Sequence, residues 1–101
     1  MVRHVILWTI KPEYKKSSHF ETVKEGIREG LEALNGKIPG MVSLRVITDS
    51  LPSSSADVML DCLFESGEAL KAYAKDPLHN AAADGKVRPY TDVRLCMDFE
   101  E

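Results

Sequence analysis

Apolar side chains alternate with other residues in four segments of the chain, and this two-residue period predicts β-strands. The segments are residues 2–11, 41–49, 57–65 and 91–99. In the first segment both alternating sets are largely apolar, so we expect this strand at the centre of a sheet that is covered on both faces. In the last segment the apolar set is expected to face inward and the polar set outward. The inward set is Val93, Leu95, Met97 and Phe99, and the outward set is Asp92, Arg94 and Asp98.

Apolar residues between the first two strands recur at spacings of three and four, which predicts a helix with one apolar stripe. The stripe comprises Phe20, Val23, Ile27, Leu31 and Leu34. Ser17 or Ser18 is the expected N-cap, with Glu21 three residues beyond Ser18 completing a capping box, and Asn35-Gly36 predicts the end of the helix. Two shorter helices are expected after the third strand. The first runs from Ser66 to Lys75, and the second is capped by Asp76, has Pro77 in its first turn and ends at Gly85.

The predicted order, β-α-β-β-α-β, indicates a single α+β domain over residues 1–101 with the ferredoxin-like arrangement. Right-handed crossovers place both helical regions on one face of an antiparallel sheet. The opposite face keeps apolar residues that no helix covers, and a patch of that size needs a partner. We therefore expect a homodimer in which two sheets meet face to face as a dimeric α/β barrel. The uncovered apolar residues are Val5, Leu7, Ile47, Met59 and Leu63, and the charged residues expected on the same face are Arg45, Asp61 and Arg94.

Composition narrows the classes of partner. The chain has 101 residues, 44% of them hydrophobic and 29% charged, which is typical of a globular protein, and its net charge of -3 disfavours nucleic acid as a partner. No apolar stretch approaches the length of a membrane helix, and the amino terminus lacks the pattern of a signal peptide. Cys62 and Cys96 are isolated, which favours free thiols in a reducing compartment. We expect a cytoplasmic protein.

His4, Tyr73 and His79 are the residues with the clearest chemical potential. His4 shares a strand face with Ile6 and Trp8, the face that is expected to meet the helices. Tyr73 and His79 are expected on those helices, so the three side chains could converge on one cavity between sheet and helices. There Ile6, Trp8 and Phe20 would form the ligand pocket. A neutral histidine could deprotonate a carbon next to a carbonyl while Tyr73 stabilises the resulting oxyanion. Packing alone would also explain each residue. We expect no metal, because no carboxylate pair has suitable spacing, and no cofactor.

Two stretches, "RHVILWTIK" at residues 3–11 and "AYAKDPLHN" at residues 72–80, resemble the stress-responsive A/B barrel (Dabb) family of the dimeric α/β-barrel superfamily. One characterised plant branch, olivetolic acid cyclase, catalyses an aldol condensation on a polyketide thioester. The resemblance implies catalytic roles for His4, His79 and Tyr73. Near residue 26, where the cyclase has a pocket tyrosine, this chain has "KEGIREG", which implies a differently shaped pocket. The family also implies alternatives: a non-catalytic ligand carrier, a stress-associated oligomer, or a haem protein that uses His79.

Overall fold

The computed structural model describes residues 1–101 and contains one sheet and a layer of helices. The strands are β1 (Val2–Ile10), β2 (Met41–Ile47), β3 (Val58–Phe64) and β4 (Thr91–Glu100). The helices are α1 (Pro12–Lys15), α2 (Phe20–Glu32), α3 (Gly67–Ala74) and α4 (Pro77–Ala82), and α4 continues into a π-helical turn, η1 (Ala83–Val87). Apart from the short α1, which was not predicted, the order agrees with the β-α-β-β-α-β pattern.

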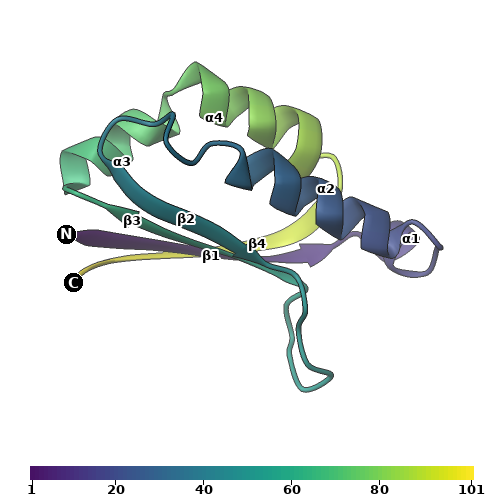
Figure 1. Cartoon of the computed structure of the whole chain (residues 1–101). Helices are drawn as coiled ribbons and strands as arrows, with labels where there is room; N and C mark the ends of the chain where they lie inside the picture. The colour runs from purple at the N-terminus through teal and green to yellow at the C-terminus, as the bar shows by residue number, and fades with distance from the viewer.

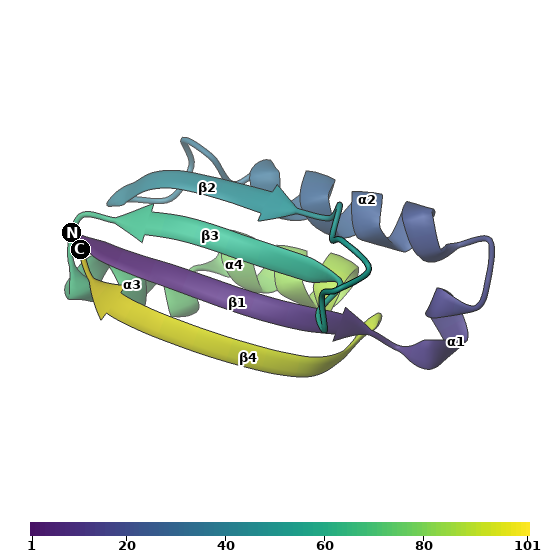
Figure 2. The same ribbon diagram turned by 90° about the horizontal axis from the view of Figure 1, so that it is seen from below.

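The four strands form one antiparallel sheet in the order β2-β3-β1-β4. The central position predicted for β1 is therefore confirmed, and β4 is an edge strand. Figure 1 shows α2, α3 and α4 together above one face of the sheet. Figure 2 views the other face, on which no helix lies, with α2 behind the β2 side and β4 at the opposite edge.

The hydrophobic core lies between the helices and the helix-covered face of the sheet. Alternate residues of β1 and β3 point into it, as their two-residue period requires. On the helix side, Ile27 and Leu31 are the most deeply buried residues of the α2 stripe. The strand residues that contribute to this core are Ile6, Trp8, Ile10, Leu44, Val46, Val58, Leu60, Cys62 and Phe64.

Both ends of α2 differ from the prediction. The capping box was wrong: His19 precedes the helix without a side-chain cap, and the Ser17 hydroxyl accepts a hydrogen bond from the His19 amide instead. At the other end, Gly36 has the predicted left-handed conformation, with a φ of +79°, but α2 ends earlier than predicted, at Glu32 with Ala33 as its C-cap. Asn35 then bonds both the amide and the carbonyl of Leu44, which fastens the helix end to β2.

The later helices are capped as predicted. Ser66 accepts a hydrogen bond from the Ala69 amide, and Asp76 accepts one from the Leu78 amide. Gly85, however, does not end the second helix. The chain passes through it in the π-helical turn η1, in which the Arg88 amide donates to the Ala83 carbonyl at 2.8 Å.

The predicted orientation of β4 was wrong. His4 of β1 lies opposite Asp98, so Asp98 and its alternate neighbours Cys96 and Arg94 point to the helix side. The predicted inward set instead points to the helix-free face, and Val93 and Leu95 are 50% and 63% exposed there. The reason is that β4 is an edge strand beyond the main helix cover. Its apolar side extends the apolar face that Val5 and Leu7 begin.

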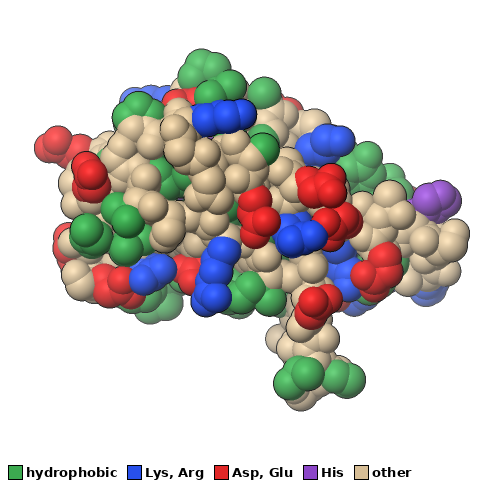
Figure 3. All heavy atoms as spheres, in the orientation of Figure 1, with side chains coloured by type: hydrophobic (Ala, Val, Ile, Leu, Met, Phe, Trp, Pro, Cys, Tyr) green, Lys and Arg blue, Asp and Glu red, His purple; other side chains and the backbone are tan.

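The helix-free face thus carries more apolar surface than the sequence indicated. Its exposed hydrophobic residues are Leu7, Ile47, Val93, Leu95, Met97 and Phe99. Arg3 and Arg45 both pair there with Asp61, at 3.0 and 3.2 Å. The loop between β2 and β3 projects from the body on this side, and Figure 3 shows hydrophobic side chains at its tip. None of the helices is long and apolar enough to cross a membrane.

Candidate functional site

His4 lies on the central strand and is held by the neighbouring edge strand. Its Nδ1 is 2.5 Å from Oδ1 of Asp98, the residue directly opposite in the β1–β4 register. The imidazole is 7% exposed, whereas the Asp98 carboxylate is open to solvent. A carboxylate bonded to one ring nitrogen fixes the orientation of an imidazole and leaves Nε2 for other partners. The pair therefore resembles the histidine–carboxylate dyad of acid–base enzymes.

Tyr73 brings the second polar group to this region from α3. The cap at Ser66 starts the helix, and Tyr73 in its last turn is directed into the core, where it is 2% exposed. Its ring meets His4 edge to face at 6.2 Å and packs against Phe64 at 5.1 Å between centroids. Its hydroxyl is buried without a hydrogen-bond partner. Burial raises the pKa of Tyr73 well above its ordinary value, so the hydroxyl remains a donor.

His79 completes the group from α4. The Asp76 cap and Pro77 fix the start of this helix, which turns the His79 ring onto Tyr73 with 4.0 Å between centroids. Its Nδ1 is also buried without a partner. The pKa of His79 is lowered, first by burial and then by the positive charge of Arg88. A neutral imidazole is the form that accepts a proton.

A small enclosed cavity of about 90 Å³ lies beside His79. Two predicted pocket residues, Ile6 and Trp8, line it. The third, Phe20, does not: it packs at the start of α2, with Lys24 Nζ 4.3 Å from its ring centroid. The other lining residues are Leu31, Leu60, Ala83, Val87, Arg88, Thr91 and Arg94. Ala83 and Val87 belong to the π-helical turn, a type of helix irregularity that is frequent at functional sites.

An open groove of about 570 Å³ runs along β4 next to α3 and is lined by His4 of the cluster, whereas Tyr73 lines neither this groove nor the enclosed cavity. His4, Cys96 and Asp98 line it, and Arg94 borders both the groove and the enclosed cavity. Every other arginine of the chain pairs with a carboxylate, whereas Arg94 has none. Its guanidinium lies beside the Cys96 thiol and has no carboxylate partner, so it suits an anionic or carbonyl oxygen of a ligand.

Sequence reasoning missed Asp98, Cys96, Arg94 and Arg88 as parts of this region. The first three were assigned to the wrong face or left out because apolar residues of β4 were assumed to point inward. One signal was present: a buried histidine needs a polar partner, and β4, which pairs with β1, carries Asp98. Nδ1 of His4, Sγ of Cys96 and the carboxylate of Asp98 also lie within 4.8 Å of one another, so this group offers metal ligands.

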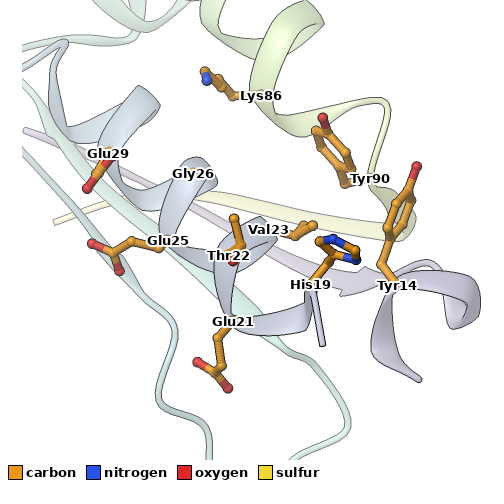
Figure 4. A pocket seen from close by; sticks show the side chains of 10 residues that line it. All are labelled: Tyr14, His19, Glu21, Thr22, Val23, Glu25, Gly26, Glu29, Lys86 and Tyr90. Carbon is orange, nitrogen blue, oxygen red and sulfur yellow. The ribbon is translucent and has the colours of Figure 1, made fainter. Parts of the chain in front are cut away.

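The largest hollow, about 660 Å³, lies elsewhere, on the outer surface between α2 and η1. Figure 4 shows Glu21, Glu25 and Glu29 along the α2 side, with Lys86 opposite them on η1. Tyr14 and Tyr90 meet edge to face at its end, 5.1 Å between centroids. Neither unpartnered buried atom of the chain faces this groove. The chemistry of the inner cluster therefore makes it the stronger candidate site.

The fold and the site together define a ferredoxin-like α+β protein with a His–Tyr–His cluster between its sheet and its helices. Residues 2–101 match the family model of the Stress responsive A/B Barrel Domain, and the chain belongs to this family. The family and fold class predicted from the sequence are thereby confirmed. A comparison with curated proteins gave no match.

Solved structures of the same fold support this assignment. A protein from Bacteroides fragilis, described as dimeric and ferredoxin-like, has a TM-score of 0.89 and 25% identity, covering 99% of this chain and 95% of that chain. A protein from Arabidopsis thaliana has a TM-score of 0.79 and 25% identity, with coverages of 100% and 95%. A hydroxynitrile lyase from Passiflora edulis has a TM-score of 0.77 over 97% and 90% of the two chains, and its 16% identity shows a shared fold alone.

Proposed function

We propose that the protein is an acid–base enzyme that needs no cofactor and acts on a small carbonyl compound, with His4, Tyr73 and His79 as its catalytic residues. The observation that carries the proposal is the pair of buried polar atoms without partners, Tyr73 Oη and His79 Nδ1. Such atoms are costly to bury. His79 lines the small cavity and its ring packs on Tyr73, an arrangement suited to a ligand that bonds His79 and reaches the neighbouring hydroxyl.

The roles follow from the surroundings of each group. Neutral His79 accepts a proton from the carbon next to the carbonyl. The Tyr73 hydroxyl, whose pKa is raised by burial, donates a hydrogen bond to the oxygen on which negative charge develops. The His4–Asp98 dyad supplies a second imidazole of fixed orientation to return the proton. The resulting enolate then reacts as in aldol condensation or isomerisation.

Space and charge restrict the substrate. A cavity of about 90 Å³ is well below the ~300–1,000 Å³ of typical ligand pockets. Only the reacting carbonyl part of a ligand would enter it, and a longer hydrophobic part would extend into the groove along α3. Arg94 borders both spaces and would bind the carbonyl oxygen or a carboxylate of the substrate.

We infer that the active form is a homodimer with the helix-free sheet faces in contact. The exposed apolar residues of this face would otherwise be left in water. Arg3 pairs with Asp61 and Glu101, and Arg45 pairs with Asp61, all within one chain, so these charges are balanced before contact. Related structures described as dimeric share the fold.

A ligand carrier without catalysis is the second candidate, and the same two unpartnered atoms favour it. A stress-associated oligomer with no ligand would instead leave them unsatisfied permanently. The haem alternative does not fit: His79 is packed against Tyr73 at 4.0 Å, and the adjoining cavity of about 90 Å³ is far smaller than a porphyrin.

Exchange of α-protons tests the enzyme proposal directly. Acetone, propanal and pyruvate would be incubated with the protein in D₂O, and the loss of their α-proton signals would be followed by NMR. We expect faster exchange than in buffer for at least one probe, and a decrease of roughly 10²–10⁴-fold in His79→Asn, the usual contribution of a general base.

His19→Asn is the matched control, because His19 is an exposed histidine outside the cluster and its loss should not alter the rate. Histidine signals recorded in the same samples separate the two candidates. Shifts of His4 and His79 without proton exchange would support a carrier. No exchange and no shifts with any probe would refute both.

A further inference from the structure

His4, Cys96 and Asp98 form a compact group of nitrogen, sulfur and oxygen donors at the β4 edge. Sγ of Cys96 is 3.8 Å from His4 Nδ1 and 3.6 Å from Asp98 Oδ1. The sheet produces this arrangement, because Cys96 and Asp98 are alternate residues of one strand and His4 is the cross-strand partner of Asp98. All three therefore project from the same face.

We propose that these three side chains bind a divalent zinc ion, with a fourth coordination position open to the groove along α3. This site is distinct in chemistry from the proposed acid–base reaction, and its existence does not depend on that reaction.

The distances between donors agree with a tetrahedral centre in two of three cases. Zinc bonds of about 2.3 Å to sulfur and about 2.0–2.2 Å to nitrogen and oxygen place sulfur about 3.6 Å from each of the other donors. The observed separations of 3.8 and 3.6 Å are close to this value. The His4–Asp98 separation of 2.5 Å would have to lengthen by about 0.9 Å. Asp98 is exposed, so its carboxylate can rotate by this amount.

Access and charge also suit a metal ion. Cys96 and Asp98 are exposed and line the groove together with Gly67, Leu70 and Ala74 of α3. Arg94 and Lys71 line the same groove. The thiolate and carboxylate ligands would cancel the two positive charges of the zinc ion. The bound ion would then not repel the side chains of Arg94 and Lys71. A water molecule or a small anion would complete the coordination.

The donor set selects the metal. Thiolate and imidazole favour zinc over magnesium and calcium, which prefer ligands that are all oxygen. Three protein ligands and one open position are the pattern of accessible zinc sites rather than of closed structural ones. A zinc ion here would occupy Nδ1 of His4 and the Asp98 carboxylate. Metal binding and the use of the His4–Asp98 dyad in acid–base chemistry would then exclude each other.

The test measures metal binding itself. The chelator-treated full chain would be titrated with Zn²⁺ by calorimetry, and with Co²⁺ while absorbance is recorded. We expect one equivalent per chain and, with Co²⁺, a thiolate-to-metal band. Cys96→Ser should abolish the band. Cys96→Ser and Asp98→Asn should each weaken Zn²⁺ binding by roughly 100-fold or more, since loss of even an outer-sphere partner costs about 10- to 100-fold.

Asp92→Asn is the matched control, because it removes an exposed carboxylate of the same strand outside the group and should leave binding unchanged. Circular dichroism would verify that each variant is folded. Absence of the thiolate band, or equal affinity in wild type and Cys96→Ser, would overturn the proposal. Zinc binding without α-proton exchange would support the metal site and refute the enzyme proposal. Exchange without zinc binding would support the enzyme proposal and refute the metal site.

Discussion

Strands β1 and β4 are hydrogen-bonded neighbours with alternating sequences, but they direct opposite kinds of side chain toward the helix side of the sheet. In β1 the helix-side residues, such as Ile6 and Trp8, lie in the core. In β4 the residues on that same side are Arg94, Cys96 and Asp98, and its apolar residues face the helix-free side. The difference shows that an apolar pattern identifies the side of a strand that needs cover. It does not identify whether helices or a second sheet cover that side.

The same comparison explains where the candidate site lies. Strands under the helices offer a dry environment, and the edge strand offers polar groups that the helices leave accessible. His4 is on the last covered strand and bonds to Asp98 on the first uncovered one at 2.5 Å. A catalytic or metal-binding group needs both conditions, and the two meet along the β1–β4 boundary of this sheet.

The largest expected effect on stability comes from the helix side. Leu60→Ala would remove a side chain that is 1% exposed in the core, and losses of about 2–5 kcal/mol are usual for such truncations. Urea denaturation would measure the loss, which should be the same at all protein concentrations. The matched variant Leu95→Ala, at a site 63% exposed in one chain, should cost much less in dilute protein. Equal losses in both at low concentration would contradict the distinction between the two faces.

A charge on the helix-free face should act on assembly rather than on the fold. Met97→Asp would place a carboxylate where the chain exposes a side chain at 66%, and burying that charge between two sheets would be costly. We expect light scattering to show a shift from dimer to monomer, with the circular dichroism spectrum retained. Glu68→Gln, on exposed α3 surface away from this face, should leave the dimer intact. Wild type that is monomeric at micromolar concentration would refute the dimer.

The smallest effect concerns pH. Burial lowers the pKa of His79 from an ordinary 6.5. The positive charges of Arg88, His4 and Arg94 lower it further and Asp76 opposes them, with the Tyr73 ring in contact. The unfolded chain therefore binds this proton at a higher pH than the folded chain. Stability should decrease as the pH falls through 6.5 and level off below the folded-state pKa.

Urea denaturation over a pH series would measure this dependence. His79→Asn should reduce the acid sensitivity, and His19→Asn should leave it as in wild type. An unchanged pH profile in His79→Asn would show that the buried imidazole is not the group responsible.

The local pattern of residues in the sequence was sufficient to predict most of the strands and helices. Two-residue periods placed the strands, the stripe around Ile27 placed α2, and Ser66 and Asp76 started α3 and α4 as predicted. These features depend on neighbours within a few residues, so the pattern carries them. The sequence also indicated His4, Tyr73 and His79, which the fold brings into ring contact through Tyr73.

Other features depend on how the elements pack, and only the tertiary structure decided them. The side of β4 that faces the helices followed from its edge position. The pairing of His4 with Asp98, 94 residues apart, followed from strand register. Phe20 shares the α2 stripe with Ile27 but lies away from the cavity, because η1 and β4 close that space near Leu31. Periodicity specifies which faces of an element are apolar, and packing specifies what each face meets.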